Sequence, residues 1–259
     1  MPSPLGRPSR LRAQVARVRA LDSANKIALG GLVLAGLAFA APSLGSAYHH
    51  VFAQDSVVVE AKQLNSFCTS TWSTLPGNDD LLPLLPEADT REIVRWERER
   101  RIVQRQTLRV LIGLRGNTDK AAQLRDVTIT VVSRDPLPTG VRPDVRTLGC
   151  GNGEEPPQAA GINLDLLAVG RPVSLSALRG KPGQRAAAKE ALDWGKPVSL
   201  PHSLNSGEVY SLFLLGRTEN YDVRWKATLT WWDGEKTKSV ELDNDGRPFH
   251  VMADPGGTP

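Results

Sequence analysis

The chain has 259 residues, of which 40% are hydrophobic, and a net charge of +4 at pH 7. Its first 26 residues hold six basic groups and one acidic group, so the remainder holds 26 basic and 27 acidic groups and is nearly neutral. A nearly neutral main part lacks the electrostatic footprint that binds polyphosphate, which excludes nucleic acid as a partner.

An apolar segment without charged side chains runs from Ile27 to Tyr48. As a helix rising about 1.5 Å per residue, it is long enough for a hydrocarbon core of about 30 Å. The alternative is a cleaved signal peptide, because the densest apolar run stops at Pro42 and small residues follow at 45–47 and 51–53. The long segment before it favours a retained transmembrane helix, with the lipid bilayer as a partner. Both interpretations export the rest of the chain.

The orientation of this segment follows from its flanks. Before it stand six basic residues and one acid, Asp22; the basic residues are Arg7, Arg10, Arg12, Arg17, Arg19 and Lys26. Because Lys and Arg are retained on the cytoplasmic side, we expect the N-terminus inside and residues from about 49 onward outside the cell membrane. Secretion after signal cleavage is the alternative.

The two cysteines, Cys68 and Cys150, lie on the expected outer side. A pair of cysteines in an oxidising compartment most often forms a disulfide, which here would close a loop of about 80 residues and stabilise the fold by roughly 4 kcal/mol. Two free thiols are the alternative. The scattered histidines give no metal-ligand spacing.

Along the exported part, the β-branched stretch Ser56–Lys62 predicts a strand. The segment Thr90–Gln106 is predicted to be a helix capped by Asp89 or Thr90, with an i,i+4 pair between Glu97 and Arg101 and a buried stripe of Ile93, Trp96 and Val103. Its arginines alternate with glutamates, which favours a solvated, self-paired face over a docking face for an acidic polymer or lipid; they are Arg91, Arg95, Arg98, Arg100, Arg101 and Arg105.

A period of two then predicts strands in three places. Their apolar faces are Leu108, Val110, Ile112 and Leu114; Val127, Ile129 and Val131; and Val223, Trp225, Ala227, Leu229 and Trp231. We expect a long loop at 134–161, another strand at 162–169, and a short helix within 176–196. Asp233-Gly234 is predicted to be a two-residue hairpin turn, and "DNDG" a second turn.

Eight or nine short strands with one or two short helices predict a mainly β fold, an antiparallel β-sandwich with an immunoglobulin-like topology as one form of it. The predicted organisation is a basic cytoplasmic tail (1–26), a transmembrane helix or signal-peptide core (27–48), an extracytoplasmic domain (55–252) and a disordered tail (253–259).

The exported part shows no catalytic, cofactor or metal motif: it has no nucleophile elbow, zinc-binding or phosphate-loop pattern. "ELDNDG" matches half of a calcium loop, but Met252 falls where a bidentate carboxylate is needed, so a hairpin turn is the better interpretation. Trp232 falls on the polar face of its strand, where an indole can stack on a sugar or peptide or be covered by a loop.

The region Cys68–Trp72, the strand pair "LRVLIGLRGNTDKAAQLRDVTITVVSR", "YDVRWKATLTW" and "DNDGRPFHV" together resemble a loosely defined group of actinomycete membrane-anchored proteins. The resemblance implies one transmembrane segment followed by an exported β domain, and it carries no catalytic motif.

The sequence therefore predicts a non-enzymatic binding module of the cell envelope, with envelope proteins or glycan as partners. The alternatives are a cell-wall hydrolase using two carboxylates among Asp222, Asp233 and Glu235, and a glycan-binding module centred on Trp232.

Overall fold

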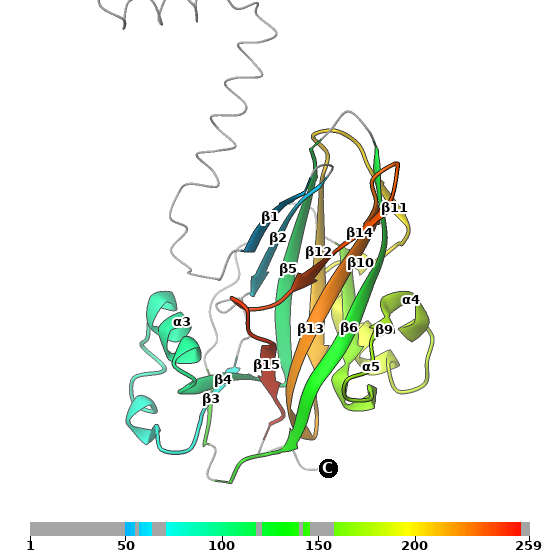
Figure 1. Ribbon diagram of the computed structural model, residues 1–259. Coiled ribbons are helices and arrows are strands. Elements are labelled where there is room, and N and C mark those ends of the chain that lie inside the picture. Colours follow the sequence, from blue (N-terminus) through cyan, green and yellow to red (C-terminus); the bar gives the residue numbers. More distant parts are fainter. Residues whose placement is uncertain are drawn as a thin grey trace, which may run out of the picture. The chain divides into compact units, whose positions relative to one another are not determined.

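Two β-sheets form most of the structure, which is a computed structural model (Figure 1). The structure describes residues 50–54, 57–63, 71–117, 121–139, 142–145 and 158–254. All of these residues belong to one unit, Gly45–Pro259. The predicted transmembrane segment, the basic N-terminal residues, Cys68 and Cys150 lie outside the described residues. Among the residues described, no helix has the length and apolar character needed to cross a bilayer.

The smaller sheet has six strands. In spatial order they are β1 (His50–Gln54), β2 (Val57–Gln63), β5 (Thr107–Gly116), β12 (Val209–Arg217), β8 (Gln158–Asn163) and β10 (Lys196–Pro197). The β1 strand pairs with β2, so the sheet begins before residue 55, where the sequence placed the start of the domain.

The larger sheet has nine strands. Along its main path they are β11 (His202–Leu204), β6 (Ala122–Pro136), β13 (Tyr221–Trp232), β15 (Phe249–Met252), β4 (Ile102–Arg105), β3 (Thr71–Thr74) and β7 (Arg142–Val145). Two more strands lie off this path: β14 (Thr237–Leu242) pairs with β13, and β9 (Val173–Ser174) pairs with β6.

The predicted mainly β fold with few helices is confirmed, and the two sheets share one hydrophobic core. The three alternating apolar faces expected from the sequence are all buried in it. Trp225 of β13 packs against Gly216 of β12, where a Cβ atom would come within 2.8 Å of the indole. Side chains of the two sheets are thus in direct contact, as in a β-sandwich.

A purely antiparallel arrangement was wrong, because both sheets contain parallel pairs: β8 with β12, β10 with β8, and β15 with β4. Parallel neighbours need a crossover of about a dozen residues or more. The segment between β8 and β10 supplies one, and it contains α4 (Leu175–Leu178) and α5 (Arg185–Leu192), as predicted for a short helix in this region.

The helix predicted over Thr90–Gln106 is shorter than expected. It is α3 (Thr90–Arg98), and most of the remaining segment forms β4 (Ile102–Arg105). Its start is confirmed: Asp89 Oδ1 accepts from the backbone N–H of Glu92 at 2.9 Å, and Glu92 Oε2 accepts from Asp89 N at 3.0 Å. Ile93, Trp96 and Val103 are buried as expected, but Val103 lies in β4.

The predicted pair between Glu97 and Arg101 was also wrong. Arg101 contacts Asp80 at 2.5 Å, while Glu97 accepts from the indole N–H of Trp72 at 3.2 Å. Residues i and i+4 are neighbours only within a continuous helix. Because the helix ends before Arg101, that side chain does not lie on the same face as Glu97.

Two further local predictions needed correction. The strand expected at 162–169 ends at Asn163, because the Asn163 side chain accepts from the N–H of Asp165 and starts a 3₁₀ turn. The turn after β13 has four residues rather than two, since Trp232 pairs with Thr237. The expected long loop at 134–161 contains β7 and the start of β8.

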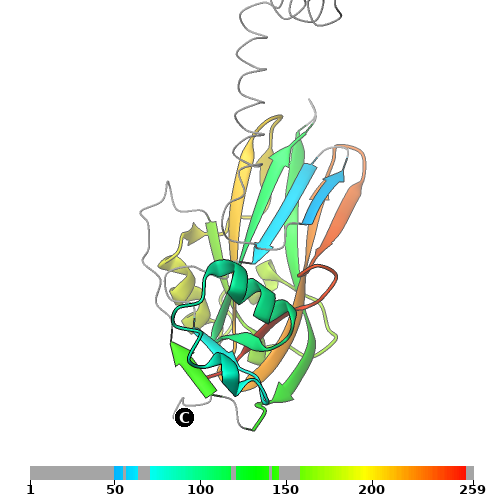
Figure 2. The same cartoon turned by 90° about the vertical axis from the view of Figure 1, so that its left-hand side faces the viewer.

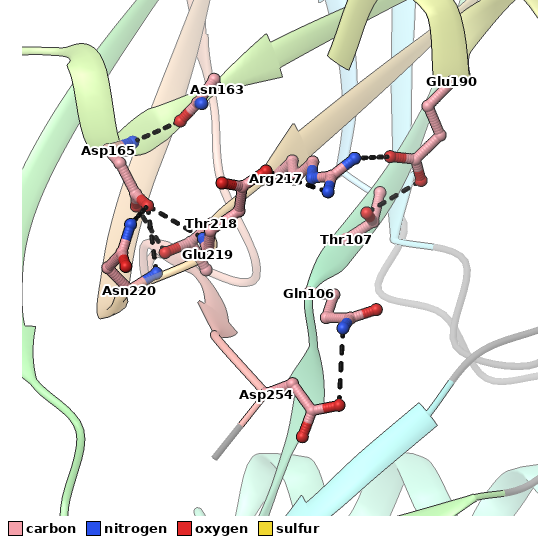
Figure 3. Close-up of polar contacts among 10 residues, drawn as sticks. All are labelled: Gln106, Thr107, Asn163, Asp165, Glu190, Arg217, Thr218, Glu219, Asn220 and Asp254. Carbon is pink, nitrogen blue, oxygen red and sulfur yellow. Dashed lines mark hydrogen bonds and ion pairs between the residues drawn. The ribbon is translucent and has the colours of Figure 1, made fainter. Parts of the chain in front are cut away.

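A polar corner joins the β12–β13 connection to the turn after β8 (Figure 3). The Asp165 carboxylate accepts from the Thr218 hydroxyl at 2.5 Å, from Glu219 N at 2.9 Å, and from the backbone and side chain of Asn220. Beside it, Arg217 donates to Glu190 of α5 at 3.2 Å. The Asp165 side chain thereby accepts from the backbone N–H groups of Glu219 and Asn220, which lie between β12 and β13 and take part in no strand pairing.

The helices occupy opposite sides of the two sheets. Figure 1 shows α3 at the left and α4 with α5 at the right, and Figure 2 shows α3 facing the viewer after a quarter turn. A recess lies beside each of these groups of helices.

Candidate functional site

The recess beside α3 is a cleft of about 370 Å³ between the end of that helix and the larger sheet. Its walls come from the residues after β3 and α3, from β13, and from the turn between β14 and β15. The lining residues are Leu75, Glu97, Arg98, Arg100, Arg224, Asn244, Asp245, Arg247, Pro248 and His250. We call it the arginine cleft.

Positive charge exceeds negative charge in the arginine cleft: four arginines and one histidine face two carboxylates. Arg98 lies 3.7 Å from Asp245, with both side chains about half exposed. Arg224 contacts Asp135 at 3.3 Å and Asp222 at 3.8 Å, both outside the lining. The pairs of Arg98 with Asp245 and of Arg224 with Asp135 are exposed, and exposed ion pairs are weak, so an anion in the cleft can compete for both arginines.

The other two arginines have no carboxylate to balance them. Arg247 donates to the backbone carbonyl of Arg98 at 3.0 Å. Neither Arg247 nor Arg100 forms an ion pair with any carboxylate in the described part of the chain. Both side chains are exposed, so two guanidinium groups with bidentate hydrogen-bonding capacity face the solvent at one cleft.

The chain takes an unusual backbone conformation to place Arg100 there. The N–H of Arg100 bonds to Glu97 O at 2.9 Å and that of Arg101 bonds to Trp96 O at 2.8 Å, which is a Schellman ending for α3. Its left-handed residue is normally glycine, but here it is Arg100, with φ of 57°. An arginine at this position costs roughly 1 kcal/mol relative to glycine, and such strain is typical of functional sites.

The Schellman turn at the end of α3 also reduces the partial negative charge that the free carbonyl groups of a helix C-terminus carry. Its last carbonyls accept hydrogen bonds from the N–H groups of the turn and, at Arg98, from Arg247. With these carbonyls satisfied, the arginines dominate the local field.

On the opposite wall, His250 of β15 is held by Asp222 of β13. Its Nε2 atom lies 2.5 Å from Asp222 Oδ1, and only 8% of the Asp222 side chain is exposed. The contact fixes the imidazole ring at the edge of the cleft, with Nδ1 as its other nitrogen. Among the described residues that line the cleft there is no serine, threonine or cysteine, the side chains that a His–Asp pair activates as nucleophiles.

The Asn244 side chain adds a neutral polar group. Its buried amide oxygen has no hydrogen-bond partner among the described residues. A buried acceptor without a partner is costly to the fold. Because this oxygen is closed to solvent, it offers no contact to a ligand in the cleft.

Of the three carboxylates in the hydrolase alternative, Asp222 is remote from the other two. It is the second residue of β13 and Asp233 follows the end of that strand, which places them more than about 30 Å apart at the rise of an extended strand. Carboxylates that cleave a glycoside lie about 5–10 Å apart. Asp233 instead accepts from the N–H groups of Glu235 and Lys236, which, with Lys238 at 3.1 Å, lower its pKa below the usual range. Asp222 thus forms no pair with either of the other two.

Trp232, the predicted stacking residue, is half-buried at the end of β13. The Arg125 guanidinium lies 5.0 Å from its ring centroid, a cation–π contact that occupies one face of the indole. No group of three His, Cys, Asp or Glu side chains gathers as metal ligands would in the part of the chain that the structure describes.

The sequence missed the arginine cleft because its parts are separated along the chain. Of the arginines in 91–105, Arg98 and Arg100 line it, whereas Arg101 binds Asp80 and Arg105 is buried against Asp254. Arg224 and Arg247 arrive from β13 and from the "DNDG" turn. The one local signal was the excess of arginine around the predicted helix end.

No protein-family model matches this chain, and no curated protein matches it.

Proposed function

We propose that the described domain is a non-catalytic binding module of the cell envelope, carried on the outer side of the cell membrane by the apolar segment 27–48. Its ligand is an anionic envelope polymer, and the arginine cleft takes a phosphate or carboxylate group of that polymer. The observation that carries the proposal is the pair of exposed guanidinium groups, Arg100 and Arg247, without carboxylate partners in one cleft.

The chemistry of the cleft supports an anionic ligand over a neutral one. Arginine presents a planar fork of donors that matches phosphate and carboxylate oxygens, and each charge-assisted hydrogen bond contributes about 1.5–3 kcal/mol.

The proposal is tested by calorimetric titration of the full-length chain in lipid nanodiscs with inorganic phosphate, glucuronate and glucose. We expect both anions to bind and glucose not to bind. The double variant Arg100→Gln, Arg247→Gln should bind the anions at least about tenfold more weakly, because two charge-assisted contacts are lost.

The matched control is Arg91→Gln with Arg115→Gln, which removes the same charge from exposed positions outside the cleft. It should leave anion affinity unchanged. Equal losses in the two double variants would show a general charge effect and contradict a specific site in the cleft.

A further inference from the structure

The second recess lies on the side of the sheets opposite α3, and its chemistry differs from that of the arginine cleft. It is a groove of about 400 Å³ lined by residues of α4, α5 and the edge of the smaller sheet. Figure 1 labels these helices at the right of the view. This volume falls within the range of small-molecule sites. Its apolar lining consists of Ala159, Ala160, Leu175, Leu178, Ala188, Leu192, Pro197, Val198 and Leu200.

Close packing of α5 on β8 forms one wall of this groove. Gly161 makes the approach possible, because a Cβ atom there would come within 1.8 Å of the Ala187 carbonyl oxygen. Ala187 and Ala191 are the buried residues of α5 and face the sheet. The neighbouring face of the same helix therefore lines the groove. That face carries Arg185, Ala188, Lys189 and Leu192, at the spacing of one helical stripe.

The charged residues of the groove are all cations. Arg179, Lys181, Arg185 and Lys189 line it, and its described lining includes no aspartate or glutamate. Arg179 donates to the Val198 carbonyl at 2.6 Å, while Lys181, Arg185 and Lys189 form no ion pair within the described residues. Arg185 and Lys189 stand four residues apart on α5, where like charges destabilise a helix by about 0.2–0.5 kcal/mol. An anion placed between them would remove this repulsion.

The apolar lining is not fully covered by the protein itself. Leu192 is 55% exposed and Pro197 is exposed, while Leu178 and Val198 below them are buried. The groove thus combines exposed apolar side chains with three cations that form no ion pair within the described part of the chain. A ligand that matches both features has an apolar chain and an anionic end.

We infer that this groove binds a single-chain anionic amphiphile, a fatty-acyl chain ending in a carboxylate. The chain lies on Leu175, Leu192 and Pro197, and the carboxylate is held by Arg185 and Lys189 of α5. The site is separate from the arginine cleft, with which it shares no lining residue.

The test uses the full-length chain in phospholipid vesicles and a photoreactive dodecanoate, with the labelled peptides identified by mass spectrometry. We expect labelling within 159–200, competed by dodecanoate at least about tenfold more effectively than by dodecanol, and not by acetate. Labelling confined to 27–48, or equal competition by dodecanoate and dodecanol, would overturn the inference.

Two pairs of variants separate the groove from nonspecific partitioning. Ala188→Phe fills the groove from an exposed position and should abolish the labelling, whereas Ala186→Phe, exposed on α5 but outside the lining, should retain it. Arg185→Gln with Lys189→Gln should remove the preference for dodecanoate over dodecanol, and Arg171→Gln with Lys196→Gln should preserve it. Labelling that survives Ala188→Phe in a normally folded protein would contradict the proposed site.

Discussion

Thr71 and Val145 are cross-strand partners in the antiparallel pairing of β3 with β7. Cys68 precedes Thr71 by three residues, and Cys150 follows Val145 by five. The chain therefore enters β3 and leaves β7 at the same end of this strand pair.

From this pairing and the short separations of the two cysteines from it, we predict a disulfide between Cys68 and Cys150. Replacing both cysteines by alanine should lower the free energy of unfolding by roughly 4 kcal/mol, because the unfolded chain loses the closure of a long loop. Denaturant unfolding of the double variant measures this, with alkylation and intact-mass analysis of the parent protein as the control. Two freely alkylated thiols in native material would contradict the prediction.

We predict that Arg100 lowers the free energy of unfolding relative to glycine at the same position. Arg100→Gly relieves the left-handed backbone at the end of α3, so we expect an increase in the free energy of unfolding of about 1 kcal/mol together with weaker anion binding. Arg91→Gly, inside the same helix, should instead destabilise by about 1 kcal/mol and leave binding unchanged. Thermal unfolding and phosphate titration of both variants give the two measurements. A less stable Arg100→Gly protein would show that the arginine is not strained.

The polar corner around Asp165 should stabilise the fold without taking part in binding. Asp165→Ala leaves the donors of Thr218, Glu219 and Asn220 without their acceptor, which should cost about 1–3 kcal/mol in unfolding experiments. Asp193→Ala, at an exposed carboxylate after α5, should change stability by less than about 0.5 kcal/mol. Equal changes in the free energy of unfolding for the two substitutions would mean that the polar corner does not stabilise the fold.

Asp233 should make the fold sensitive to acid. Backbone N–H groups of Lys236 and Glu235, and then Lys238, hold its pKa below the ordinary value of 3.8. A carboxylate with a lowered folded-state pKa stabilises the fold above the unfolded-state pKa, and this contribution is lost as the pH falls below about 4. Asp233→Asn should therefore lower the melting temperature at pH 7 more than at pH 3. The same loss at both pH values would contradict the charge-based explanation.

Local patterns predicted the elements that depend on local chemistry. The alternating faces of β5, β6 and β13 and the Asp89 cap of α3 were found because burial and capping follow a fixed spacing. The end of α3 was missed, because a Schellman ending normally shows a glycine and here Arg100 takes its place.

The parallel pairings and both recesses could not be read from the sequence, because they depend on contacts between distant segments. Arg100 and Arg247 meet at one cleft only through the position of β4 beside β15. The groove beside α4 and α5 likewise depends on Gly161, whose role appears only when α5 lies against β8.

The central claim is that the arginine cleft holds an anion of the envelope, and arginine modification in intact cells tests it most directly. Phenylglyoxal labelling followed by peptide mass spectrometry compares Arg100 and Arg247 with Arg91 and Arg115, all of which are exposed in the structure. We predict that the two cleft residues are protected in cells and that the protection disappears in the purified protein. Equal modification of all four arginines in cells would contradict the claim.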